Sequence, residues 1–149
     1  TYENKVSAND SNPLWFCNIG SCDVTIKNCT FKASRPIKIV EQSVAGANIT
    51  ITDNKFDMSL TNSADDASKP KNDAIMFSTM TSDSTLGDVV ISGNEVTGAN
   101  ALLTFFSPSQ ITMAEGATFT VSGNTLNGAQ LSVEWKTTTA YKPDFVTVK

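Results

Sequence analysis

Charged side chains, which acid–base and metal chemistry need, make up only 17% of this chain of 149 residues. The sequence has no histidine and no Cys-x-x-Cys pair, so zinc and other transition metals would find too few ligands. The clearest concentration of carboxylates is Asp65, Asp66 and Asp73, in a polar loop predicted over residues 58–73. An oxygen-rich loop of this kind could bind calcium, the only cofactor that the sequence suggests; the alternative is an acidic loop that is simply solvated.

Three large aromatic residues, Trp15, Trp135 and Tyr141, have the chemistry that carbohydrate stacking needs. An aromatic ring with a polar edge suits the apolar face of a pyranose. The two tryptophans lie toward opposite ends of the chain, where large aromatics can also cover the exposed core of a terminal repeat. Ligand contact and end capping are therefore both open for these residues.

Composition limits the classes of partner. A net charge of −4 with only 11 Lys and Arg argues against affinity that rests on neutralising phosphates, so nucleic acid is not expected as a partner. No apolar run approaches the ~18 residues that cross a bilayer, so no membrane insertion is expected. With 40% hydrophobic and 17% charged residues, we expect one globular domain over residues 1–149. Since the start lacks the basic and apolar regions of a signal peptide, either a targeting segment has been removed or the sequence is a piece of a longer chain.

Three cysteines leave at least one thiol unpaired. Cys17 and Cys22 flank a stretch of four residues and could be joined across a turn. Cys29 belongs to a repeated segment and takes a position that is Asn in the other copies. The spacing is compatible with a disulfide between Cys17 and Cys22, and also with three unpaired thiols.

The chain is organised around a repeated segment. Residues 88–98 (DVVISGNEVTG) recur almost position for position as residues 118–128, and the same template is present at residues 48–57 and 23–32. Each copy begins with an alternation of apolar and polar residues, which predicts a short strand with one buried face. The expected inward pairs are Val24 and Ile26, Ile49 and Ile51, Val89 and Ile91, and Phe119 and Val121.

Two further short strands follow in each copy. After turn residues that tolerate positive φ, a second strand buries one apolar residue; these residues are Phe31, Phe56, Val96 and Leu126. A third alternating segment is predicted at residues 36–39, 74–77, 102–105 and 130–133. Residues 13–17 match this third segment before the first full copy, and residues 144–148 restart the first.

The spacing of the copies indicates the architecture. Ile26, Ile51, Ile91 and Val121 are separated by 25, 40 and 30 residues. Intervals of this length without apolar residues at 3.6 spacing favour a coil of three short strands and three turns over helical repeats. The excess residues are predicted to form loops, at residues 58–73, 79–87, 107–117 and 137–142.

The template resembles the right-handed parallel β-helix of the pectate-lyase-like superfamily, in which a Val-x-Ile strand is followed by a stacked Asn. Asn54, Asn94 and Asn124 match this asparagine ladder, and Cys29 departs from it at the start. Stacked amides can satisfy one another at the strand spacing of ~4.8 Å. The resemblance covers residues 13–149 and implies an all-β fold of about five coils.

The resemblance also implies that catalytic and sugar-binding groups lie on the outer face of the third-segment sheet. The expected outward row runs through Trp15, Lys38, Met76, Thr104 and Ser132. A lyase would need a base there, for which Lys38 and the nearby Arg35 are candidates, beside calcium-binding acids. A hydrolase would need paired carboxylates, and Glu134 is the only acid expected on this face. The alternative is that Lys38 and Glu134 are solvated strand-face charges.

Because these catalytic sets are incomplete, the sequence favours a non-catalytic extracellular module of a bacterial secreted or surface protein. Its expected partner is a polysaccharide or another surface ligand, bound through Trp15, Lys38, Glu134, Trp135 and Tyr141. The alternatives are a polysaccharide lyase or glycoside hydrolase, or a fragment of one, and a trimeric viral fibre. Open strand edges at the ends of a β-helix recruit other chains, so we also expect further coils or an oligomeric partner to cover them.

Overall fold

The computed structural model describes residues 2–3, 13–20, 22–33, 36–40, 46–58, 73–78, 84–99, 101–106, 110–130 and 143–149. The strands in these ranges form four β-sheets. Every strand pair but one among the described residues is parallel. The all-β class predicted from the sequence is confirmed. None of the described residues belongs to a helix long and apolar enough to span a membrane.

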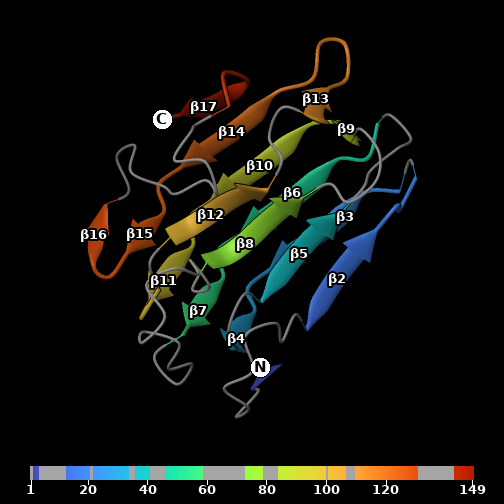
Figure 1. Cartoon of the computed structure of the whole chain (residues 1–149). Coiled ribbons are helices and arrows are strands. Elements are labelled where there is room, and N and C mark those ends of the chain that lie inside the picture. The colour runs from blue at the N-terminus through green and yellow to red at the C-terminus, as the bar shows by residue number, and fades with distance from the viewer. Residues whose placement is uncertain are drawn as a thin grey trace.

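The first strand of every repeat enters one five-stranded sheet, the first-strand sheet (Figure 1). In spatial order its strands are β17 (Val146–Val148), β14 (Phe119–Ser122), β10 (Val89–Ser92), β6 (Ile49–Thr52) and β3 (Val24–Lys27). Equivalent residues pair one to one, so Val89 lies between Ile49 and Phe119. The predicted inward rows and the restart of the template at residues 144–148 are therefore confirmed.

The second strands form the second-strand sheet. Its order is β1 (Tyr2–Glu3), β4 (Thr30–Lys32), β7 (Lys55–Asp57), β11 (Glu95–Thr97), β15 (Thr125–Leu126) and β16 (Ala129–Gln130). Phe31, Phe56, Val96 and Leu126 share one row, as predicted.

The fourth repeat departs from the predicted pattern after β15. The repeat predicts a third strand over residues 130–133, but Gln130 lies in β16, which pairs antiparallel with β15. Asn127 (φ 52°) and Gly128 (φ 82°) turn the chain back, because an Asn-Gly pair with two positive φ values suits a two-residue hairpin. Residues 131–133 lie outside the described residues.

The third strands form the third-strand sheet, in the order β12 (Ala101–Phe106), β8 (Asp73–Ser78), β5 (Ile37–Val40) and β2 (Leu14–Cys17). The register places Phe16 beside Ile39, Ile39 beside Phe77 and Phe77 beside Phe105. Four of the five predicted third segments are thus confirmed as one sheet.

Two segments predicted as loops contain strands. β9 (Ser84–Leu86) and β13 (Ile111–Met113) pair in parallel within residues 79–87 and 107–117. Leu86 and Ile111 are buried, and this burial explains why short alternating segments within longer loops join the fold. In the loop predicted over residues 58–73, Met58 packs in the core and Asp73 begins β8, while residues 59–72 lie outside the described residues.

The core consists of inward side chains from the sheets. A cluster of rings occupies its C-terminal part, with centroids 5.2 to 5.9 Å apart between the pairs that contact; its members are Phe77, Phe105, Phe119 and Phe145. Phe31 and Phe56 stack at 5.2 Å nearer the other end. Aromatic contacts therefore link successive repeats as well as successive strands.

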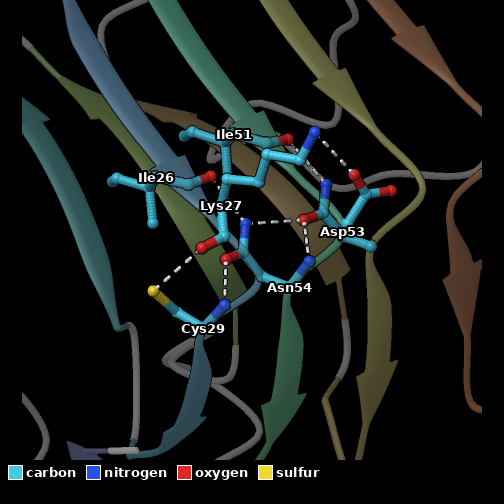
Figure 2. A network of polar contacts seen from close by, with 7 residues as sticks. Ile26, Lys27, Cys29, Ile51, Asp53 and Asn54 are labelled. Atoms are coloured by element: carbon cyan, nitrogen blue, oxygen red, sulfur yellow. Dashed lines mark hydrogen bonds and ion pairs between the residues drawn. The ribbon is translucent and has the colours of Figure 1, made fainter.

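A buried asparagine ladder follows the first-strand sheet. The Oδ1 atoms of Asn54, Asn94 and Asn124 accept from backbone N–H groups of the preceding repeat, at 2.9 to 3.0 Å. Each side-chain amide donates to a strand carbonyl of the preceding repeat. Figure 2 shows Asn54 directed at the backbone of Cys29, which heads the ladder and whose own thiol makes a longer contact, 3.4 Å, to the Lys27 carbonyl.

A second ladder lies just before each first strand, and the sequence did not reveal it. Backbone N–H groups of Asn48, Asp88 and Thr118 donate to the side-chain oxygens of Asp23, Asn48 and Asp88 at 3.3, 2.9 and 2.8 Å. In this exposed ladder the later repeat supplies the backbone N–H donor, whereas in the buried asparagine ladder the later repeat supplies the side-chain oxygen that accepts from the backbone N–H. Strands β6, β10 and β14 are therefore held between repeats at both of their ends.

Candidate ligand-binding site

The structure brings together two of the residues that the sequence nominated, Trp15 and Lys38. They are paired directly across β2 and β5 and alternate with inward residues, which places both side chains on the outer face of the third-strand sheet. The Lys38 ammonium nitrogen lies 4.6 Å from the centroid of the Trp15 ring, within cation–π distance. Trp15 is nevertheless 54% exposed, so much of the indole remains available to a ligand.

Two further members of the predicted outer row, on β8 and β12, are not open to solvent. Met76 and Thr104 continue the register from Lys38, but they are only 6% and 1% exposed. Val40 and Ser78, which point to the same side, are also buried. The predicted outward register holds across β8 and β12, but these residues are covered there, because alternation shows only which side a residue faces. Accessible surface on the described part of this face is concentrated at Trp15, Cys17 and Lys38.

The other nominated residues do not join this pair within the described structure. Asp73 is 1% exposed and lies on the inward side of β8 with Ile75 and Phe77, so it is not a solvated loop carboxylate. The predicted residues outside the described ranges are Arg35, Asp65, Asp66, Glu134, Trp135 and Tyr141. Across the described part of the chain, no three potential metal-ligating side chains gather in one place.

A shallow hollow on the second-strand sheet was missed by sequence reasoning. It has a volume of about 240 Å³, and its lining residues are Thr30, Lys32, Lys55, Phe56, Asp57, Glu95 and Thr97. The Lys55 ammonium and the Glu95 carboxylate lie 3.5 Å apart and are both largely exposed. With two lysines and two acids the hollow is charge-balanced, so it favours neither anions nor cations. The alternation in these strands predicts that their polar residues face outward. It does not predict that these residues line one shared hollow.

The three cysteines are free thiols, with Cys17 and Cys22 exposed and Cys29 half-buried. Between the first two, Asn18 and Gly20 adopt positive φ, and the Cys22 N–H donates to the Ile19 carbonyl at 3.4 Å. The bridge that the spacing allowed is not formed in this structure.

Comparisons with known proteins identify no relative. The chain matches no protein-family model, no curated protein and no solved structure.

Proposed function

We propose that the chain is a right-handed parallel β-helix of about five coils, of the kind found in the pectate-lyase-like superfamily. The support is the order of strands: in each of the first three repeats the chain visits the first-, second- and third-strand sheets in turn. Each strand then pairs in parallel with its equivalent in the next repeat. The buried asparagine ladder is what the resemblance implies for such a coil.

On this fold, we propose a non-catalytic, extracellular carbohydrate-binding module of a bacterial secreted or surface protein. The observation that carries the proposal is the exposed indole of Trp15 beside the ammonium of Lys38. A sugar would stack on the free part of the ring, because its C–H face is apolar and the ring is large and rigid. Lys38 would donate hydrogen bonds to hydroxyl or carboxylate oxygens at the edge of the same sugar.

The surroundings of Lys38 favour binding over catalysis. Its two partners across the sheet are Trp15 and Met76, and neither is an acid. A hydrolase needs two carboxylates on either side of the bond that it cleaves, and a lyase base needs a partner that neutralises the sugar carboxylate. The described residues next to Lys38 supply neither arrangement.

Glycan-array binding tests the proposal. The wild-type chain should bind at least one class of glycan, Trp15→Ala should abolish binding, and Trp15→Phe should retain part of it. Val90→Ala is the matched control, since Val90 is a partly exposed apolar residue on a different sheet. Trp135→Ala tests the second predicted tryptophan in the same assay.

Two results would overturn the proposal: no binding to any glycan, which would leave a scaffold role, or binding unchanged in Trp15→Ala. Incubation with acidic polysaccharides and calcium tests the enzymatic alternative. An increase in ultraviolet absorbance from unsaturated products would show that the protein is a lyase.

A further inference from the structure

The outer face of the first-strand sheet carries two regular rows of side chains, all of them short except Lys27 at one edge. The first row crosses all five strands and consists of Thr25, Thr50, Val90, Thr120 and Thr147. The second row, two residues further along the strands, consists of Lys27, Thr52, Ser92 and Ser122. All of these residues are exposed or half-buried. Four of the five residues in the first row are threonines.

The centre of this face carries no charge. Strands β6, β10 and β14 present six outward side chains, all of them hydroxyl-bearing except Val90. Lys27 stands at the β3 edge and is paired with Asp53 at 3.6 Å. The second-strand sheet of the same molecule instead presents Lys32, Lys55, Asp57 and Glu95 outward. Charged residues are among the types most often exposed to water, and their absence from the centre of this face distinguishes it from the second-strand sheet.

The positions of these hydroxyls are held by the fold. The asparagine ladder fixes the strands at one end and the ladder through Asn48, Asp88 and Thr118 fixes them at the other. Side-chain ladders are among the features that keep parallel sheets flat. Threonine and valine are also stiff at χ1, so the array loses little entropy when a rigid surface meets it.

The spacing of the array matches an ordered water lattice. Neighbouring strands lie ~4.8 Å apart, and outward residues on one strand lie about 6.6 Å apart. The spacing between strands is close to the shorter repeat distance between oxygen atoms on the prism faces of ice. Hydroxyls can take lattice positions, while the methyl groups of threonine and valine favour ordered water between them. We propose that this face binds ice.

Other occupants fit the face less well. A polysaccharide surface would call for aromatic platforms, and none of the nine residues in the two rows is aromatic. A second copy of the chain would call for an apolar centre, whereas Val90 is the single apolar member of the rows. The neutral, regular and rigid array suits a neutral, regular and rigid ligand.

Partition into slowly growing ice tests the proposal directly. The wild-type chain should be enriched in the ice fraction relative to serum albumin, which is excluded. Thr50→Lys and Thr120→Lys should each lose this enrichment, because a long charged side chain interrupts the array. Thr125→Lys is the matched control: Thr125 is a half-buried outward residue on the second-strand sheet, opposite Glu95. It should partition as the wild type does.

Exclusion of the wild-type chain from ice would overturn the proposal, with no dependence on any variant. Equal loss in Thr50→Lys and Thr125→Lys, with circular dichroism showing that both are folded, would also overturn it. Because Trp15 belongs to a different sheet, failure here leaves the carbohydrate proposal unaffected, and the converse also holds.

Discussion

The side-chain oxygen of Asn94 accepts two hydrogen bonds from Asn54, one from its backbone N–H and one from its side-chain amide, each 3.0 Å long. Asn94 repeats the contact one step further, donating to the Asn124 oxygen at 2.8 Å. The three residues are each 1% exposed. The polar groups of the ladder therefore satisfy one another in the core. Loss of one asparagine side chain would leave buried hydrogen-bonding groups of its neighbours without partners.

Asn94→Ala should lower the free energy of unfolding by about 3 kcal/mol, because it leaves buried donors of Asn54 without their acceptor. Asn48→Ala, in the exposed ladder, should cost only about 1 kcal/mol since water can replace its bonds. Urea unfolding followed by circular dichroism measures both. Equal effects would show that burial does not govern the cost of a missing ladder residue.

Gly93→Ala should destabilise the fold more than Gly123→Ala. Both glycines have positive φ, 64° and 61°, so both substitutions carry left-handed strain of about 1–2 kcal/mol. At Gly93 the added Cβ would also lie 2.5 Å from the Asp53 carboxylate, so this exposed side chain would have to shift, whereas at Gly123 the nearest atom is 3.9 Å away. Thermal unfolding of the two variants isolates the clash. A lower melting temperature for Gly123→Ala would contradict the prediction.

Asp88→Ala should cost about 1 kcal/mol, because the Asp88 Oδ1 atom accepts from both the backbone N–H and the hydroxyl of Thr118. Asp88→Asn keeps an acceptor at this place and should stay close to the wild type. The comparison by urea unfolding separates the hydrogen bonds from the charge. Equal losses in the two variants would show that the carboxylate charge is what matters.

Lys38→Met should weaken glycan binding by about tenfold, about 1.4 kcal/mol, because it removes the cation beside Trp15 while keeping the apolar stem. Lys38→Arg should retain most of the affinity. Lys27→Met, on the first-strand sheet, is the control for a change in net charge. Isothermal titration with a ligand from the array gives the affinities, and equal losses in Lys38→Met and Lys27→Met would refute a local role.

Thiol labelling of the folded chain should modify Cys17 and Cys22 rapidly and Cys29 more slowly, since the first two are exposed and the third is half-buried. Mass spectrometry at successive times counts the added groups. A product that takes up a single label until it is reduced would show that Cys17 and Cys22 are joined in solution.

The alternation of apolar and polar residues was enough to predict most strands and their inward sides. The alternation at residues 24–27 and 49–52 marks two equivalent strands, and the turn residues after them predict positive φ at Asn28 and Asp53. These features are local, because side-chain period and backbone preference depend on neighbours within a few residues. The ladder asparagines could be recognised because the repeat carries them to equivalent positions.

Contacts between repeats were decided only by the tertiary structure. Met76 and Thr104 are buried although they belong to an outward-facing row, and this burial depends on what packs over the sheet. The pairing of β9 with β13 depends on the position of the next repeat. The second ladder likewise joins residues 25 to 40 positions apart, such as Asn48 and Asp88. The hairpin at Asn127 and Gly128 had a local signal, the Asn-Gly pair, but the repeat pattern pointed to a third strand there. Alternation assigns each residue a side of its strand; the register between distant strands determines which side chains meet and which stay exposed.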